Sequence, residues 1–309
     1  MKKLSVVVPC YNEQETVEKF YDTAVPVLDR SDMDYEIIFV NDGSRDKTLE
    51  KLTALSQKDT RVKVINFSRN FGQQAAILCG FRHSSGDCVV ELDCDLQDPI
   101  EVVLEMLDKW REGYDVIHGR RKIRHGESFF KKFTAKIYYK FLAKISSFEM
   151  PRNTGDFKLL DRRVVDVICN MPEHEKYLRG LESWVGFKQT FVDFDRAERV
   201  AGETHYSLKK MINLAKAGIV SNSNYPLSLG FKFGLLLSFL SVAGFITLIV
   251  LLATGVYSNL VAWLFPTVGL LFGIKFVIDA IGNLYLGKVY DEVKNRPEYI
   301  VSDKINLEK

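Results

Sequence analysis

A long uncharged segment near the C-terminus most constrains what this chain can fold into. From Phe233 to Ile274 no residue carries a charge at neutral pH. This length suffices for two membrane crossings of about 20 residues each. We expect them near 233–254 and 260–284, within a transmembrane hairpin over residues 229–287. The alternative, a buried helical hairpin in a soluble core, would need a much larger protein around it.

Basic residues on both flanks of this segment indicate its orientation. Between the two expected crossings lies only TGVYSN, whereas lysines precede the first crossing and basic residues follow the second. Cytoplasmic flanks carry such an excess of positive charge. We therefore expect a multi-pass protein of the cell (cytoplasmic) membrane, with the N-terminal domain and both termini in the cytoplasm. The basic residues are Lys209, Lys210, Lys216, Lys232, Lys288, Lys294 and Arg296.

The N-terminal part of the chain alternates short β-rich runs with helical patterns. This order is typical of an α/β fold with a mostly parallel sheet covered by helices. We expect strands at 4–10, 35–42, 62–68, 88–93 and 115–119, and helices near 14–29, 46–58, 72–84 and 99–112. The predicted domain covers residues 1–205. An amphipathic juxtamembrane segment at 206–228 and a cytoplasmic tail at 288–309 flank the hairpin.

Composition and the absence of common nucleotide motifs exclude several classes of function. A net charge of +2 with 27% charged residues gives no indication of nucleic acid as a partner. Neither G-x-G-x-x-G nor a Walker A sequence occurs, which argues against a dinucleotide oxidoreductase and a P-loop NTPase. The five cysteines include no C-x-x-C pair, so we expect reduced thiols.

Two carboxylates, Asp93 and Asp95, stand one residue apart after the fourth predicted strand. In an extended chain they project to the same side, so they would repel each other unless a cation lay between them. Carboxylate oxygens suit Mg²⁺ or Mn²⁺, which usually bind through one or two acidic residues plus substrate phosphates. The pair therefore predicts a metal site for a nucleotide diphosphate.

Polar residues follow the other predicted strands as well. Ligands of parallel sheets bind at the carboxyl ends of the strands. For Asn12, Asn41 and Ser44, a role in a helix cap or turn is at least as well supported as contact with a ligand. The residues at these strand ends are Asn12, Glu13, Asn41, Asp42, Arg69, Asn70, Asp93 and Asp95.

The motifs VVVPCYNE, FVNDGSRDKT, FSRNFGQQAA and LDCDLQDP occur in this order along the predicted domain. With them the chain resembles the family 2 glycosyltransferases, which have the GT-A fold. Downstream, NTGDFKLLDRRVV, SWVGF, RAERVAGETHYS and the expected hairpin narrow the resemblance to polyprenyl-phosphate glycosyltransferases, the group of bactoprenol glucosyltransferase and dolichyl-phosphate mannose synthase. The resemblance implies transfer of a sugar from UDP-glucose or another UDP-sugar to polyprenyl (undecaprenyl) phosphate, for cell-envelope glycan modification.

The resemblance also implies roles for residues in the donor site. Asp93 and Asp95 would hold Mg²⁺ or Mn²⁺ and the diphosphate, and Arg199 would grip the donor phosphates. Thr204-His205 stands where the family usually has Ser-Lys, which leaves one phosphate contact in doubt. The residues implied to bind the nucleotide sugar are Pro9, Tyr11, Glu13, Asp42, Asp93 and Gln97.

The resemblance places Asp156 near the reacting carbon and Arg120 near the acceptor phosphate. Together with Asp95 and Arg199, Asp156 is a predicted catalytic residue. A phosphate monoester with a second pKa of about 6 is already a nucleophile at neutral pH. Asp156 therefore need not act as a general base, and we expect it to position the sugar or stabilise positive charge there. The alternative is an aspartate that caps the following segment.

The segment SFFKKFTAKIYYKFLAKISS combines an apolar ladder with a lysine ladder. Four like charges in register cost a free helix a few tenths of a kcal/mol per neighbouring pair, and an anionic membrane surface would reverse that cost. We expect a basic interfacial helix over 128–147 that guides the polyprenyl phosphate, with Lys132 and Lys136 near its phosphate. A solvated lysine face on a docked helix is an equally good interpretation of the pattern alone.

Two alternative functions fit parts of the sequence. A processive polysaccharide synthase usually carries Gln-x-x-Arg-Trp, whereas here the region reads GLESWVGF. A catalytically silent membrane module would bind nucleotide and recruit a flippase or a second transferase. The expected partners are the UDP-sugar, polyprenyl phosphate and the lipid bilayer. A second copy of the chain, a flippase and a downstream glycosyltransferase are further candidates.

Overall fold

The computed structural model describes residues 2–122, 154–173, 176–195 and 260–307, together with scattered positions between 236 and 254. The chain divides into two compact units. The α/β unit comprises Met1–Lys144, Phe148–Leu214 and Pro297–Lys309, and the helical unit comprises Ile145–Ser147 and Ala215–Arg296. The predicted segments at 128–147 and 206–228 lie outside the described residues. The predicted domain boundaries stay predictions.

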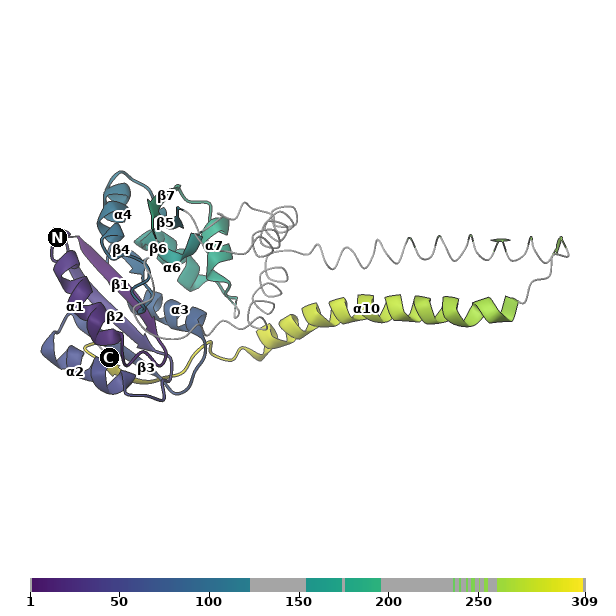
Figure 1. Ribbon diagram of the computed structural model, residues 1–309, viewed down its shortest axis with the longest axis horizontal. Helices are drawn as coiled ribbons and strands as arrows, with labels where there is room; N and C mark the ends of the chain where they lie inside the picture. The colour runs from purple at the N-terminus through teal and green to yellow at the C-terminus, as the bar shows by residue number, and fades with distance from the viewer. Residues whose placement is uncertain are drawn as a thin grey trace. The chain divides into compact units, whose positions relative to one another are not determined.

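The described residues of the α/β unit form an eight-stranded sheet (Figure 1). Its strands are β1 (Lys3–Cys10), β2 (Asp34–Asn41), β3 (Val62–Phe67), β4 (Cys88–Glu91), β5 (Val116–Arg121), β6 (Thr154–Asp161), β7 (Gln189–Phe194) and β8 (Val301–Ile305). They lie in the order β7-β5-β6-β4-β1-β2-β3-β8.

Four neighbouring pairs of strands in this sheet are parallel, namely β1/β2, β1/β4, β2/β3 and β5/β7. The pairs β4/β6, β5/β6 and β3/β8 are antiparallel. The mostly parallel α/β sheet predicted from the sequence is thereby confirmed. The sequence pattern anticipated neither the insertion of β6 between β4 and β5 nor the return of β8 to the edge beside β3.

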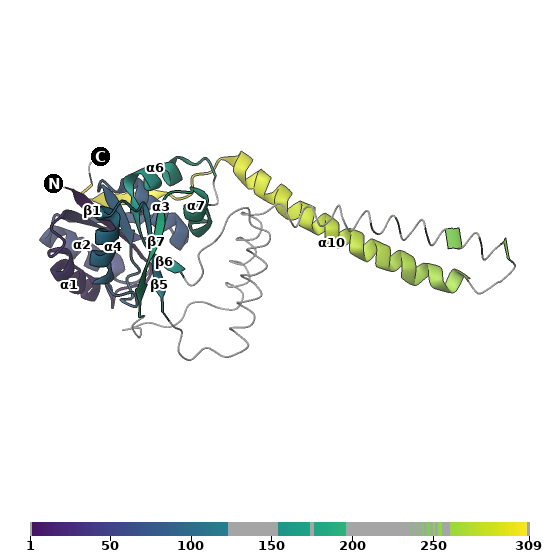
Figure 2. The ribbon, with the colours of Figure 1, turned by 90° about the horizontal axis from the view of Figure 1, so that it is seen from above.

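Helices cover both faces of the sheet because successive side chains of a strand point to opposite faces. Val6 and Val8 pack in the same core as Phe20, whereas Val7 packs with Ile77 on the other face. The first face is covered by α1 (Val17–Leu28), α2 (Thr48–Lys58) and α4 (Val102–Arg111). The second face is covered by α3 (Gln73–His83), α6 (Arg162–Asn170) and α7 (Leu178–Trp184), as Figure 2 shows.

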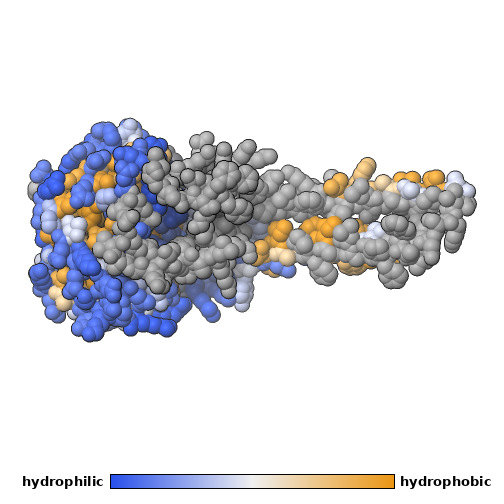
Figure 3. Space-filling model, viewed as in Figure 1, coloured by the Kyte–Doolittle hydropathy of each residue, from blue (hydrophilic) through white to orange (hydrophobic). Residues whose placement is uncertain are grey.

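The helical unit contains α10 (Leu260–Lys294), which begins at the predicted start of the second crossing. Its described surface is largely apolar in Figure 3, in contrast to the mostly hydrophilic surface of the α/β unit. Lys275 donates a hydrogen bond to Asp279 over 2.5 Å, one turn further along the helix. No helix among the described residues combines the length and the hydropathy that a membrane crossing needs.

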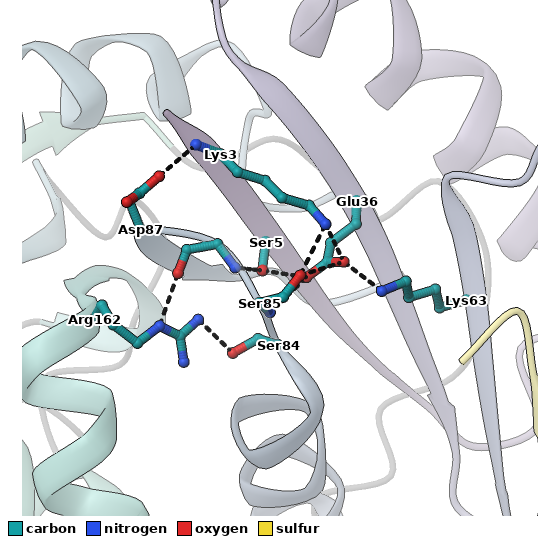
Figure 4. A network of polar contacts seen from close by, with 9 residues as sticks. Lys3, Ser5, Glu36, Lys63, Ser84, Ser85, Asp87 and Arg162 are labelled. Atoms are coloured by element: carbon teal, nitrogen blue, oxygen red, sulfur yellow. Dashed lines mark hydrogen bonds and ion pairs between the residues drawn. The ribbon is translucent and has the colours of Figure 1, made fainter. Parts of the chain in front are cut away.

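A buried charge network joins the strands near their amino ends, opposite the edge where ligands of such sheets bind (Figure 4). The side chain of Glu36 is only 2% exposed and lies 2.7 Å from Lys3 Nζ and 2.6 Å from Lys63 Nζ. It also accepts hydrogen bonds from the Ser5 hydroxyl and the Ser85 amide. Burial alone would raise the pKa of Glu36, but these donors outweigh it and lower the pKa to about 2.

We expect Glu36→Gln to lower the free energy of unfolding by about 3 kcal/mol at pH 7, since the pKa shift is more than two units and one unit corresponds to about 1.4 kcal/mol. A depressed pKa stabilises the fold above the unfolded-state value of about 4.3, and that contribution is lost as pH falls towards 2. Unfolding of the full chain in detergent should therefore show a gap between wild type and variant that narrows in acid. Asp34→Asn, an exposed change on the same strand, is the control, and a gap independent of pH would contradict the prediction.

Candidate active site

The loops after β1 and β2 are tied together at the carboxyl edge of the sheet. The Asn12 amide donates to the Ser44 hydroxyl over 2.9 Å, and the Arg45 amide donates to Asn12 Oδ1 over 2.9 Å. The Glu13 amide donates to Thr48 Oγ1 over 2.8 Å. These contacts fix the loop that carries Glu13 and the exposed ring of Tyr11, next to Pro9 at the end of β1.

The amide side chain of Asn41, at the end of β2, ties the loop after β2 to the end of β3. It donates to Asn66 Oδ1 over 2.8 Å and accepts a hydrogen bond from the Ser44 hydroxyl. Together with the contacts of Asn12, these bonds support the turn role that the sequence left open for Asn12, Asn41 and Ser44. The three side chains shape the edge of the sheet that carries the predicted donor-site loops.

Asp42 organises the loop that follows β3. Its carboxylate accepts hydrogen bonds from the amides of Phe71, at 2.6 Å, and Gly72, at 2.9 Å, and from the Asn70 side chain, at 2.8 Å. The residue is 3% exposed, and burial raises its pKa. The neighbouring Gly43 has φ +62° and packs against the backbone of Arg69. A Cβ added at Gly43 would lie 2.4 Å from that backbone, so the position requires glycine. The predicted contact of Asp42 with the nucleotide stays a prediction.

Asp93 and Asp95 lie in the loop that follows β4, at the same edge. Asp93 Oδ1 accepts a hydrogen bond of 2.9 Å from Gln73, the first residue of α3, and Asp95 Oδ1 accepts one of 3.1 Å from the amide of Gln97. Leu96, the residue between Asp95 and Gln97, has φ +57°. This left-handed conformation costs a leucine of order 1–2 kcal/mol in conformational energy. Backbone strain of this kind is concentrated at functional sites, and here it shapes the loop that carries both carboxylates.

The donor set of this loop fits a hard divalent cation. Within the described ranges, no three His, Cys, Asp or Glu side chains come together in a metal-binding group. A magnesium ion, however, commonly uses only one or two protein carboxylates and completes its shell with water and substrate phosphates. The hydrogen bond from Gln73 would orient the Asp93 carboxylate, as hydrogen-bond partners of metal ligands commonly do. The sequence pattern alone did not single out Gln73, although it lies in the quoted FSRNFGQQAA motif.

Asp156 is gripped on both oxygens by one arginine. Arg179, on α7, donates from Nε to Oδ1 and from Nη2 to Oδ2, each over 2.6 Å. Burial would raise the pKa of Asp156, but the hydrogen bonds from Arg179 and the charges of Lys158 and Arg121 outweigh it and lower the pKa. Asp156 lies inside β6, so the alternative of a capping aspartate is wrong; Asp161 is the residue that caps α6.

A buried polar layer lies next to Asp156 between the sheet and α7. Lys158, on β6, forms an ion pair of 2.5 Å with Glu182, and both side chains are at most 2% exposed. Lys158 is flanked in the sheet by Glu91 and His118. Burial and the nearby charges of Asp156, Glu182 and Asp93 outweigh Lys158 and raise the pKa of Glu91 well above its usual range. A raised pKa favours the uncharged form of this carboxyl, which is less costly to bury than the charged form.

Of the basic residues predicted to contact the donor or acceptor phosphates, only Arg120 lies among the described residues. Arg120 is half-exposed and pairs with Asp193 on β7, with its guanidinium over the ring of Phe191. The next residue, Arg121, extends instead to Asp98, with 3.5 Å between Nη2 and Oδ1, and its charge helps to lower the pKa of Asp156. The structure thus brings Arg121, rather than Arg120, near the predicted catalytic residue. Arg199, Lys132 and Lys136 lie outside the described residues.

Comparison with known proteins agrees with this architecture. Residues 5–169 match the family described as Glycosyl transferase family 2. An uncharacterized glycosyltransferase of Bacillus subtilis strain 168 is 44% identical over 98% of this chain and 94% of its own length. A prophage bactoprenol glucosyl transferase homolog of Escherichia coli K12 is 39% identical over 97% of this chain and 98% of its own. The bactoprenol glucosyl transferase of Shigella phage SfV is 37% identical over 98% and 99%.

Among solved structures, glucosyl-3-phosphoglycerate synthase from Mycobacterium tuberculosis, in complex with Mn²⁺, UDP and glucosyl-3-phosphoglycerate, aligns with a TM-score of 0.51. The alignment covers 71% of this chain and 78% of that one at 20% identity, and it shows a shared GT-A-like fold. The chain belongs to the family 2 glycosyltransferases and is thus an enzyme of sugar transfer. Within that family it is of the bactoprenol glucosyl transferase type.

Proposed function

We propose that this enzyme transfers a hexose from a UDP-sugar, UDP-glucose or a relative of it, to polyprenyl (undecaprenyl) phosphate. The observation that carries the proposal is the similarity to bactoprenol glucosyl transferases over nearly the whole length of both chains. The carboxyl edge of the sheet supports it, because the loop with Asp93 and Asp95 contacts the segment after β1, which carries Tyr11 and Glu13, through the Thr16 hydroxyl and the Cys94 thiol. The product would be a polyprenyl-phosphate sugar for modification of cell-envelope glycans.

The proposed reaction is a single displacement with inversion at the anomeric carbon. An oxygen of the lipid phosphate forms a bond to this carbon while the bond from the carbon to the UDP oxygen breaks, and UDP leaves with the electron pair. A divalent cation held by Asp93 and Asp95 would supply charge neutralisation for the leaving diphosphate. The acceptor phosphate is largely dianionic at neutral pH, so the nucleophile needs no proton removed.

Asp156 has the properties of a charge stabiliser in this reaction. A general base works best with a pKa near the working pH, whereas Arg179 holds the pKa of Asp156 below its ordinary value. The ionised carboxylate is instead suited to stabilise the positive charge that develops on the sugar in an oxocarbenium-like transition state. We therefore propose that Asp156 stabilises the charge on the sugar and that the acceptor phosphate is the nucleophile.

We propose further that residues 229–287 form a transmembrane hairpin and that the α/β unit works on the cytoplasmic side of the cell membrane. The uncharged run from Phe233 to Ile274 and the basic flanks support this. Large apolar side chains on α10 are exposed, as expected for contact with lipid. Within the proposed hairpin they are Leu264, Val268, Phe272, Leu284 and Leu286.

The test is a transfer assay with the purified full chain in detergent. The protein is incubated with undecaprenyl phosphate, Mg²⁺ and a panel of radiolabelled UDP-sugars, and label moved into the organic phase is counted. We expect label from one donor, dependent on the lipid phosphate and on Mg²⁺. If UDP bound but no donor gave labelled lipid, the proposed reaction would be refuted in favour of another nucleotide sugar or a silent nucleotide-binding module.

A further inference from the structure

The helix α7 and the strand β6 meet through two ion pairs of opposite polarity. On α7, Arg179 and Glu182 are three residues apart and share a face. On β6, Asp156 and Lys158 are two residues apart and share a face. Arg179 binds Asp156 and Glu182 binds Lys158. A shift of the helix along the strand would bring like charges together, so the two pairs set the register in which Arg179 meets Asp156.

This helix cannot hold its position through its own stability. It has seven residues, and isolated helices shorter than about 12 residues are marginal in water. Contacts with α3 hold its first turn instead. The Leu178 amide donates to Gln74 Oε1 on α3 over 3.2 Å, and the Leu178 side chain is buried in the same core cluster as Ile77 of α3. Gln74 follows Gln73, which holds Asp93, so the first turn of α3 contacts both the predicted metal loop and α7.

A second anchor of α7 comes from the far end of the chain. Lys176, two residues before the helix, donates to Glu298 Oε1 over 2.7 Å and to the carbonyl of Glu173 over 2.8 Å. Glu298 also pairs with Arg82, on α3. The side chains of Lys176 and Glu298 are 4% and 10% exposed. A pair buried to this degree is far more costly to break than a surface pair, since one charge is left without compensation.

The segment that carries Glu298 is held to the sheet by other contacts as well. Strand β8 pairs with β3, and the ring of Tyr299 stacks on Phe67 with centroids 5.0 Å apart. Asn306 donates to the carbonyls of Ser56, over 2.7 Å, and Val62, over 2.9 Å. The segment should therefore stay docked when Glu298 alone is changed, so that the contact with Lys176 can be tested by itself.

We infer that Glu298 is a positioning residue of the active site: through Lys176 it fixes the start of α7, and thereby the grip of Arg179 on Asp156. The inference rests on the proposed function, because Asp156 matters to the rate only if it acts on the transferred sugar. It gives the C-terminal segment, which follows α10 in the chain, a part in catalysis.

The experiment compares Glu298→Gln with Asp303→Asn in the full chain. Asp303 lies on the same segment and is exposed, with a hydrogen bond to Asn66. We expect Glu298→Gln to lower kcat about 10-fold, as a displaced catalytic group would, with the donor KM and the affinity for UDP unchanged. Asp303→Asn should keep the wild-type kcat. Lys176→Gln should reproduce the effect of Glu298→Gln and serves in its place if that variant does not fold.

A double variant separates positioning from a general loss of stability. In an Arg179→Lys background, where the two-point grip on Asp156 is already lost, Glu298→Gln should lower kcat less than about two-fold. An undiminished loss in that background, or equal kcat for Glu298→Gln and Asp303→Asn, would overturn the inference. Hydrogen exchange of the α7 amides gives a readout without turnover: we expect faster exchange in Glu298→Gln but not in Asp303→Asn. Unchanged exchange in Glu298→Gln would also overturn the inference. A wild type that transfers no sugar would refute the proposed function alone.

Discussion

Asp95→Ala should abolish sugar transfer, with a loss of at least about 1,000-fold, because the change removes one of the two carboxylates that would hold the cation at the leaving diphosphate. Asp95 lies in the strained loop after β4, where its Oδ1 accepts the amide of Gln97. The binding of UDP should fall to the level that the wild type shows without Mg²⁺ or Mn²⁺. Titration of UDP with and without the metal measures this independently of turnover.

The matched control for Asp95→Ala is Asp87→Asn. Asp87 precedes the same strand, β4, at its amino end, where it accepts a hydrogen bond of 2.7 Å from the amide of Lys3. A change there should alter stability but neither metal-dependent binding nor kcat. If Asp95→Ala kept metal-dependent binding of UDP and a normal rate, the assignment of the cation to this loop would be wrong. Gln73→Leu should have an intermediate effect of about 10-fold, because Gln73 only orients Asp93.

Asp156→Asn should lower kcat by about 100- to 1,000-fold with little change in the affinity for UDP. The substitution keeps the size of the side chain but removes the charge that would stabilise the sugar in the transition state. It also leaves the guanidinium of Arg179 without its counter-charge close to the proposed reacting centre. Rapid-mix measurements of transfer, together with UDP titration, separate the rate from donor binding. A nearly normal kcat would show that Asp156 has no role in the reaction.

Asp59→Asn is the control for that variant. Asp59 is held by Arg61 in a similar two-point pair, which lowers its pKa to about 2, but it lies between α2 and β3, at the amino edge of the sheet. Its loss should affect stability and leave kcat unchanged. The comparison distinguishes the effect of a broken Arg–Asp pair from the loss of a carboxylate at the sugar.

The pH dependence distinguishes a charge stabiliser from a general base. Arg179 keeps the pKa of Asp156 below its ordinary value, so the carboxylate stays ionised from about pH 5 upwards. We expect the rate to fall in acid near pH 6, where the acceptor phosphate takes up a proton. The midpoint of this fall should be the same in wild type and Asp156→Asn. Its disappearance in the variant would identify Asp156 as the titrating base.

The first five strands and the residues at their carboxyl ends could be predicted from the sequence because their signals are local. Short β-rich runs, and helical patterns between them, predict elements whose bounds differ by only a few residues from those observed, as for β1 and α2. In a parallel sheet the ends of such strands meet at one edge. The amino-acid pattern therefore suffices to place Asp93 and the loop after β2 at one edge of the sheet.

The tertiary structure decided which charges meet. Asp156 was found through its motif, but nothing in the local pattern indicates that Arg179, 23 residues later, grips it, because that contact depends on where α7 docks on β6. Which of Arg120 and Arg121 comes near Asp156 likewise depends on the end of β5, where its register to β6 shifts after His118. The return of β8 to β3, with Glu298 reaching Lys176 across 122 residues, leaves no periodic signal at all. Sequence periodicity determines the elements and the edge that they share, whereas contacts between distant charges depend on how these elements pack.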